Sequence, residues 1–231
     1  MIERRPFDQL PSEDLGWLKA RRHFSSTANH DPSQSRWGCL RVWNDEEIAP
    51  NAGFALQAHA NIEIIIYVRE GTVTHRDNLG NEGRIEAGNV LVVSAGTGIR
   101  HAEYNLEQAS ARIFQIWITP ASSGSPAWGV QPCPVAGPSG CFVAIASGMD
   151  SDPDALPIRA SARVLNAKLK VGESIEHVIR GSRLAYLVPS TGTVDVNGVR
   201  IHARDGAAIK DVDIVAITAV EDADVVMVDV H

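Results

Sequence analysis

Residues 53–73 read GFALQAHANIEIIIYVREGTV, and this stretch decides how the chain is interpreted. A short apolar run, IEIIIYV at 62–68, ends at the turn signal EG, and a second strand-like segment, TVTHRD at 72–77, follows it. Similar short segments recur along the chain between glycine-containing turns, which is typical of a small antiparallel barrel or sandwich. The pattern therefore predicts an all-β fold.

The two halves of the chain resemble each other. GTV at 71–73 follows Tyr67, and the same tripeptide at 192–194 follows Tyr186. An internal repeat on this scale indicates one β unit used twice. The sequence therefore predicts two tandem antiparallel β-barrels of about 100 residues each.

Composition divides the chain into four segments. Residues 1–37 are irregular, with a helix-compatible segment at 12–20, and we expect them to form an extension that packs on the barrels. An N-terminal barrel is expected over 38–120 and a C-terminal barrel over 141–231. Between them, 121–140 reads ASSGSPAWGVQPCPVAGPSG, and this composition predicts a linker that forms neither helix nor sheet ladder.

Charge and composition exclude several classes of partner. The chain has 21 basic and 28 acidic residues, and seven of the acids lie between Asp205 and His231. Because an acidic surface repels phosphate, we expect no direct binding of nucleic acid. The first residues are charged and no apolar segment follows them, so we expect no signal peptide; no apolar run approaches a membrane span, and the three cysteines form no CxxC motif. These features predict a cytoplasmic protein with no membrane contact.

Polar residues within the first unit point to a buried site. Alternate residues of a strand share a face, so Gln57, His59 and Glu63 are predicted to point one way, and His101 and Glu103 to pair on a second strand. Each of these side chains has a structural alternative, as a surface residue or a hydrogen-bonded core residue. If the shared face is the barrel interior, however, a divalent metal would satisfy the buried imidazoles and carboxylate together. Two histidines and one carboxylate form the type of site found in non-haem iron oxygenases.

The second unit lacks this set. The repeat places Arg180, Ala219 and Glu221 at the positions of His59, His101 and Glu103, so the C-terminal barrel is predicted to be metal-free and structural. His75, which lies just before the LGN turn, is predicted to be an exposed strand residue.

The combined motifs resemble the cupin motifs of pirins and pirin-like bacterial quercetinases. The resemblance is carried by GWLKARRHFS at 16–25, GCLRVWNDEEIAPNAGF at 38–54, AGTGIRHAEYN at 95–105 and IFQIWITP at 113–120, and it is looser in the C-terminal half. It implies a bicupin of jelly-roll type. In that family the N-terminal barrel holds one metal, usually iron, through three histidines and one glutamate.

Carried over by position, the family's second and third histidines fall on His59 and His101, and its glutamate falls on Glu103. The first histidine falls on Gln57. An amide oxygen suits late transition metals less well than imidazole does, so we expect weaker binding of the metal. The resemblance implies Fe(II), with Ni, Mn, Zn or Cu as alternatives. Glu63 is a spare candidate, because many other cupins use a carboxylate at that place.

Two functions remain open at this point. The resemblance implies a metal-dependent flavonol 2,3-dioxygenase, a quercetinase, in which Glu103 also takes the proton of the small aromatic substrate as general base. The alternative is a pirin-like regulatory module that binds a protein partner and whose metal is structural, redox-sensing or absent. The Gln57 substitution favours this alternative, whereas the three intact ligands favour the enzyme.

Overall fold

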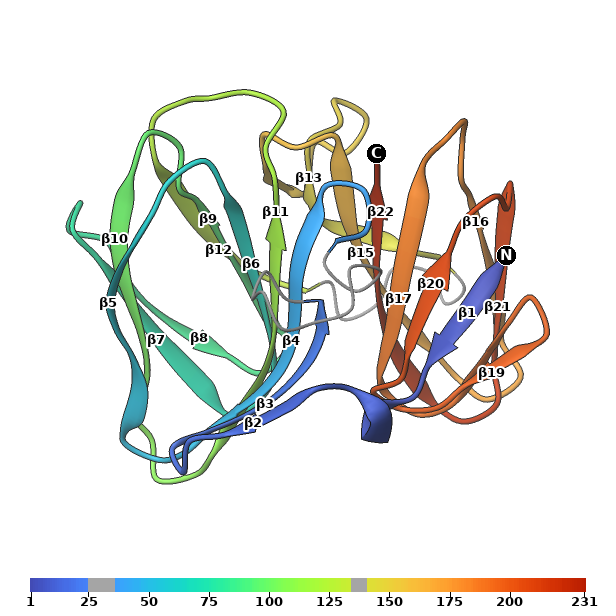
Figure 1. The fold of residues 1–231 in the computed structure, drawn as a ribbon, viewed down its shortest axis with the longest axis horizontal. Coiled ribbons are helices and arrows are strands. Elements are labelled where there is room, and N and C mark those ends of the chain that lie inside the picture. Colours follow the sequence, from blue (N-terminus) through green and yellow to red (C-terminus); the bar gives the residue numbers. More distant parts are fainter. Residues whose placement is uncertain (25–35, 134–140) are drawn as a thin grey trace.

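The computed structural model describes residues 1–24, 36–133 and 141–231, and its regular structure there is almost entirely strand. One short 3₁₀ helix, Phe7–Gln9, is the exception within those residues. Two β units lie side by side, one built mainly from each half of the chain (Figure 1). The predicted all-β fold with two tandem units is confirmed. Each unit consists of two facing sheets, as in a jelly roll, rather than one closed sheet.

The first unit packs a seven-stranded sheet against a four-stranded one. The larger sheet has the order β12 (Ala127–Pro132), β9 (Asn89–Ser94), β6 (Glu63–Glu70), β11 (Ala111–Ile118), β4 (Leu40–Ile48), β3 (Leu18–Phe24) and β2 (Ser12–Asp14). The smaller sheet has the order β5 (Ala52–His59), β10 (Ile99–Asn105), β7 (Thr72–Asp77) and β8 (Glu82–Glu86).

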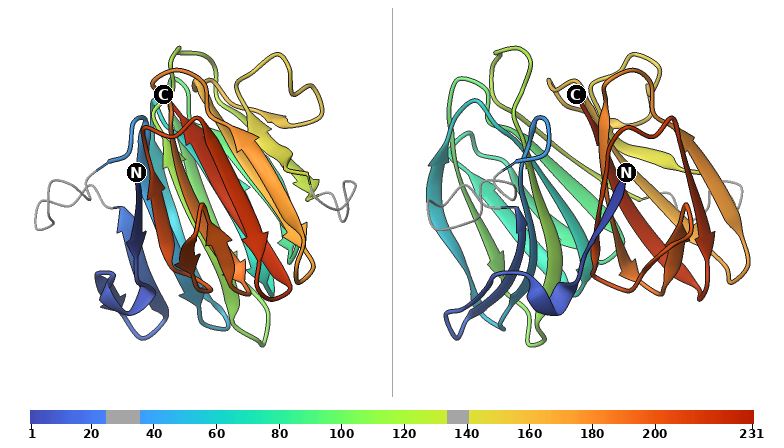
Figure 2. Two further views of the ribbon diagram at one scale, coloured as in Figure 1. Left: turned by 90° about the vertical axis from the view of Figure 1, so that its right-hand side faces the viewer. Right: turned by 45° about the vertical axis from the view of Figure 1, so that its right-hand side comes forward.

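The second unit repeats this arrangement. Its larger sheet has the order β1 (Ile2–Arg5), β20 (Gly206–Ile209), β17 (Leu184–Thr191), β22 (Ala223–Val230), β15 (Ala162–Leu169), β13 (Val143–Ser147) and β14 (Leu156–Pro157). Its smaller sheet has the order β16 (Ser174–Val178), β21 (Ile214–Ala219), β18 (Val194–Val196) and β19 (Val199–Ile201). The larger sheets of the two units face each other, as the views in Figure 2 show.

Burial of both faces explains the continuous apolar run of β6. Ile65 and Tyr67 belong to a core shared between the two units, whereas Ile64, Ile66 and Val68 belong to the interior of the first unit. A strand covered on both faces needs apolar residues at successive positions. The same packing joins the units, and the hydroxyl of Tyr67 donates to Asp224 of the second unit at 2.5 Å.

The segment at 12–20, described as helix-compatible from its sequence, forms strands instead. Ser12–Asp14 and Leu18–Phe24 form an antiparallel pair at the edge of the first unit's larger sheet. Leu18 and Ala20 are buried while Lys19 between them is exposed, which is the period-two pattern of a strand. The first strand, Ile2–Arg5, pairs instead with β20 of the second unit.

The prediction that 121–140 forms no sheet ladder is also wrong. Residues 127–132 form β12, which pairs antiparallel with β9 along its whole length. The strand lies at the edge of the sheet, where glycine and proline are tolerated because one side of the ladder needs no partner. Residues 134–140 of the predicted linker, like 25–35 of the predicted extension, lie outside the described residues.

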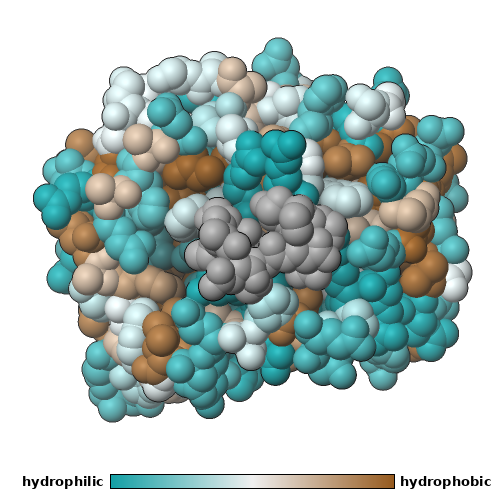
Figure 3. All heavy atoms as spheres, viewed as in Figure 1, coloured by the Kyte–Doolittle hydropathy of each residue, from teal (hydrophilic) through white to brown (hydrophobic). Residues whose placement is uncertain are grey.

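The surface seen in Figure 3 is mostly hydrophilic, and its apolar residues are scattered in small groups. Among the described residues no helix is long and apolar enough to cross a membrane.

Candidate metal centre

The central strand of the smaller sheet, β10, organises the site. It carries His101 and Glu103, and it lies between β5 and β7. His101 is directly opposite Gln57 on β5, whereas Glu103 is opposite His75 on β7. Directly opposed residues share a face of a sheet. The period-two prediction of a common face for His101 and Glu103 therefore agrees with the pairing.

Four side chains gather inside the first unit: His59, His75, His101 and Glu103. The ring centroids of His59 and His101 lie 5.0 Å apart, and those of His75 and His101 lie 5.4 Å apart. His101 Nδ1 lies 3.2 Å from Glu103 Oε1. One donor atom from each of His75, His101 and Glu103 lies within 4.8 Å of the other two.

The donor atoms at this place suit a divalent cation. His59 Nε2, His101 Nδ1 and Glu103 Oε1 are buried and make no hydrogen bond. Burial lowers the pKa of His59, and the neighbouring His101 lowers it further, so the His59 imidazole is neutral at neutral pH. A neutral imidazole is the form that binds metal. Buried polar atoms without a partner cost free energy, and a metal ion could bind all three of these atoms together.

The prediction that His75 is exposed is wrong. The side chain is 0% exposed, it stacks on Trp128 of β12, and neither ring nitrogen makes a hydrogen bond of normal geometry. Asp77 Oδ2 lies 3.5 Å from its Nε2. Burial lowers the pKa of His75, so it too is neutral. Its burial follows from the pairing of β7 against β10, a long-range contact that the local THRD sequence does not reveal.

The predicted common face for Gln57, His59 and Glu63 is only partly correct. Gln57 and His59 lie on β5 and both line the same cavity, although Gln57 is exposed. Glu63 begins β6 in the facing sheet, where it is buried and accepts a hydrogen bond from Ser94. Because a turn separates 59 from 63, the strand alternation does not continue across it.

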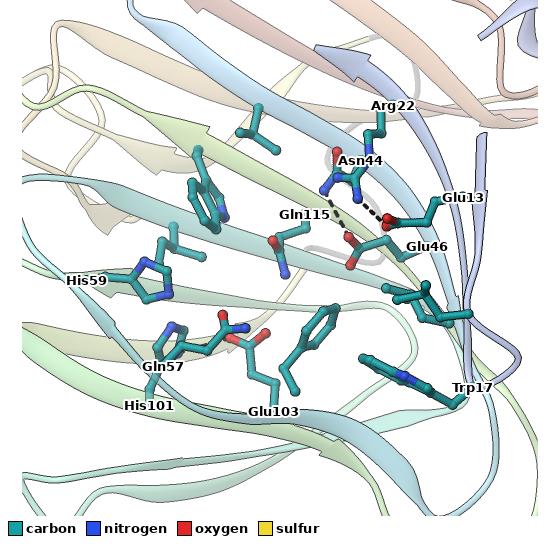
Figure 4. A pocket seen from close by; sticks show the side chains of 16 residues that line it. Glu13, Trp17, Arg22, Asn44, Glu46, Gln57, His59, His101, Glu103 and Gln115 are labelled. Carbon is teal, nitrogen blue, oxygen red and sulfur yellow. Dashed lines mark hydrogen bonds and ion pairs between the residues drawn. The ribbon is translucent and has the colours of Figure 1, made fainter. Parts of the chain in front are cut away.

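A cavity of about 330 Å³ opens between the two sheets of the first unit. Trp17, Phe54, Ile64 and Trp117 form its apolar walls. Figure 4 shows Gln57, His59, His101 and Glu103 along one side and Glu46 with its neighbours on the other. Aromatic and aliphatic side chains combined with convergent polar groups are typical of a small-molecule site.

Glu46, on β4, is a second buried carboxylate in this cavity, and the sequence analysis did not identify it. It is 2% exposed, and its Oε1 accepts a hydrogen bond from Asn44 Nδ2 at 2.9 Å. Burial raises the pKa of Glu46 to about 7, with a smaller contribution from the charge of Glu103, while Asn44 opposes the shift. Near neutral pH this carboxyl group therefore exchanges between its charged and neutral forms.

Glu46→Gln should stabilise the protein more at pH 8 than at pH 5. The native pKa of Glu46 lies above the ordinary 4.5, so the unfolded chain releases this proton first and stability is lost as pH rises towards 7. Glutamine removes the ionisation and keeps the hydrogen bond with Asn44. The gain, measured by urea unfolding, should grow by about 1–3 kcal/mol between the two pH values.

Glu47→Gln is the matched control, because Glu47 is the next residue of the same strand and pairs with Arg112 at 3.0 Å on the outside. Its effect should be small at both pH values. A gain for Glu46→Gln that does not change with pH would contradict the prediction.

The second-unit residues that correspond to His59, His101 and Glu103 in the repeat do not form a similar cluster. Arg180 and Glu221 are exposed, and Ala219 is buried among apolar residues. His177 lies on β16 of the second unit's smaller sheet, and its Nε2 lies 2.9 Å from Asp229 Oδ2. That the second unit holds no metal stays a prediction.

Two tandem jelly-roll units, with a histidine–carboxylate cluster in the first, define a bicupin. The sequence model described as "Pirin" matches residues 3–118, and the model described as "Quercetinase C-terminal cupin domain" matches 144–230. The chain belongs to the pirin family.

Relatives of known name agree with this assignment. The chain is 58% identical to a pirin-like protein of Caulobacter vibrioides, covering 99% of each chain, and 54% identical to a putative quercetin 2,3-dioxygenase of Pseudomonas aeruginosa, covering all of both. It is also similar to the bacterial pirin YhhW of Escherichia coli in complex with nickel(II), with a TM-score of 0.92, 32% identity, and coverage of 100% of this chain and 99% of that one. The predicted family resemblance is confirmed.

Proposed function

We propose that this protein is a metal-dependent dioxygenase of the quercetinase type, which opens the heterocycle of a flavonol. The observation that carries the proposal is the cluster of buried ligand atoms on His59, His101 and Glu103, which make no hydrogen bond, at the wall of a cavity that is also lined by aromatic side chains. The name of the Pseudomonas relative, a putative quercetin 2,3-dioxygenase, supports the same substrate class.

One divalent ion would be held by His59, His101 and Glu103, with the Gln57 amide as a weaker fourth ligand. We propose Fe(II) first, with Ni, Mn, Zn and Cu as alternatives. The nickel(II) complex of the Escherichia coli pirin supports a divalent ion in this fold. A bound ion would act as a Lewis acid, which favours the deprotonated form of a substrate hydroxyl group.

The chain's own residues position the substrate. Trp17, Phe54 and Trp117 line the cavity and would contact a planar aromatic ligand while excluding water from it. A carboxylate must then accept the flavonol proton, and Glu103, predicted for that role from the sequence, lies at the metal centre. The C-terminal unit, 141–231, would remain a structural partner.

Oxygen consumption tests the proposal directly. The protein, loaded under anaerobic conditions with Fe(II) or Ni(II), should oxidise quercetin roughly 100-fold or more faster than the same concentration of free ion. A rate equal to that of the free ion would remove the enzymatic function.

Gln57→His should raise the affinity for Ni(II) by about 10- to 100-fold. The new imidazole would lie opposite His101 on the cavity face, where it replaces a weak oxygen donor with a nitrogen donor. Competitive titration and elemental analysis after dialysis would measure the change.

Leu56→His is the matched control, since Leu56 is exposed on the neighbouring position of the same strand. Unchanged affinity in Gln57→His would contradict the assignment of Gln57. His75, which lies close to His101 and Glu103, would then be the next candidate for the remaining ligand position.

The second candidate function is a pirin-like module that binds a protein partner. The exposed amide of Gln57 at the first ligand position favours it, because a site with one weak ligand loses metal more easily. A partner protein that co-purifies equally with the wild type and with a metal-free His101→Ala variant would support it. The cytoplasmic location stays a prediction.

A further inference from the structure

We propose that Glu46, rather than Glu103, accepts the proton of the flavonol hydroxyl group that binds at the metal centre. This inference rests on the proposed function, because it assigns a step of that reaction. In this step the substrate O–H bond breaks, its electron pair stays on the flavonol oxygen, and an O–H bond forms at Glu46 Oε2. No oxidation or reduction occurs in the step, and the net charge of the cavity contents does not change.

The position of Glu46 fits this role. The side chain extends from β4 of the larger sheet, across the cavity from His101 and Glu103 of the smaller sheet (Figure 4). A planar ligand between the two sheets would therefore have the metal ligands on one side and the Glu46 carboxyl group on the other.

The hydrogen bonds of Glu46 leave one of its carboxylate oxygens without a partner. Oε1 accepts from Asn44, but Oε2 is buried and has no partner. The nearby cation, Arg22, donates instead to Glu13. An unpaired buried carboxylate oxygen costs free energy, and a ligand that donates a hydroxyl hydrogen would relieve that cost.

The electrostatic surroundings make Glu46 a suitable acceptor near neutral pH. Burial is the main cause of its raised pKa, and the negative charges of Glu103 and Asp45 add to the shift, whereas Arg22 and the hydrogen bond from Asn44 oppose it. A base whose pKa lies near the working pH transfers protons most effectively.

Glu103 is less suited to the same task. Its Oε1 lies 3.2 Å from His101 Nδ1, and in the proposed site its carboxylate binds the ion. Protonation of Glu103 would remove the single negative charge that this ligand set supplies to the cation. Glu46 has no such conflict, because it lies on the other sheet and touches none of the proposed ligands by a hydrogen bond or ion pair within the described residues.

Anaerobic binding of quercetin to the Ni(II)-loaded protein would test the assignment without turnover. The flavonol absorbs at longer wavelength as its anion, so the spectrum of the bound ligand reports where its proton is. The wild type should bind the anion with a midpoint near or below pH 7. Glu46→Gln should shift that midpoint upward by at least about one pH unit, a tenfold change, and should lower kcat/KM for quercetin by about 100-fold.

Four comparisons separate this role from others. Glu46→Asp should restore part of the effect, and Glu47→Gln should leave both the spectrum and kcat/KM unchanged. Nickel content should be equal in all variants, because Glu46 is not a ligand. Luteolin, which lacks the 3-hydroxyl group of quercetin, should bind wild type and Glu46→Gln with equal affinity.

The two proposals fail in different ways. If the wild type binds the quercetin anion but oxidises it no faster than free ion does, the dioxygenase function is lost and the role of Glu46 in deprotonation stands. If Glu46→Gln binds the anion with the wild-type midpoint, or if the wild type binds no anion, the role of Glu46 is overturned.

Discussion

His101→Ala should abolish metal binding and flavonol oxidation while leaving the fold intact. His101 is the central member of the cluster, with its ring 5.0 Å from that of His59 and its Nδ1 3.2 Å from Glu103. Loss of a residue that only supports a ligand costs about 10- to 100-fold in metal affinity, and loss of a ligand should cost more, so we expect a decrease of at least about 100-fold. Quercetin oxidation should fall to the rate of free ion.

Elemental analysis after incubation with one equivalent of Ni(II) and dialysis would measure the loss. The circular dichroism spectrum should be unchanged, since the ring contacts of His101 within the described part of the chain are with His59 and His75 of the same site. His202→Ala is the control, because His202 is an exposed histidine of the second unit. Stoichiometric nickel in His101→Ala would contradict the proposed centre.

Trp43→Ala should reduce the free energy of unfolding by about 3–5 kcal/mol. Trp43 is 0% exposed and lies in the apolar core shared by the two units. Its ring packs against Phe114 of the first unit at 5.6 Å and Tyr186 of the second at 5.5 Å, both edge-on. Removing the indole therefore leaves a cavity at the junction, and both units should lose stability together.

Urea unfolding followed by circular dichroism would measure the change, with Leu106→Ala as the control. Leu106 is 51% exposed, so its truncation should change stability by less than about 0.5 kcal/mol. A loss of less than about 1 kcal/mol for Trp43→Ala, or a second transition that it leaves unchanged, would show that the shared core does not couple the units.

Short apolar segments between turn signals were enough to predict strands, and period-two alternation was enough to predict one face of the site. TVTHRD at 72–77 is a strand with the predicted bounds, and the shared face of His101 and Glu103 follows from their spacing. These predictions succeeded because side-chain direction along a strand depends only on local geometry.

Two features of the site that the sequence did not reveal depend on contacts between distant segments. His75 is buried because β7 pairs with β10, and Glu46 faces the cavity because β4 lies inside a sheet, between β3 and β11. Neither register can be read from the surrounding residues. The prediction from composition that 127–132 forms no strand failed for a related reason. A segment that contains Gly and Pro can form a strand when it pairs at the edge of a sheet.

The pairing of the first strand has a consequence for how the protein can be divided. Ile2–Arg5 completes the edge of the second unit's larger sheet, although Leu18–Phe24, a few residues later, belongs to the first unit. A fragment that starts at residue 141 would therefore expose the backbone of β20 as an open edge, which favours aggregation. A separate peptide of residues 1–24 would have to add strands to the larger sheets of both units. The N-terminal segment thus links the two units, and a chimera that exchanges residues 141–231 alone would have to form the β1–β20 pairing between strands of two different parents.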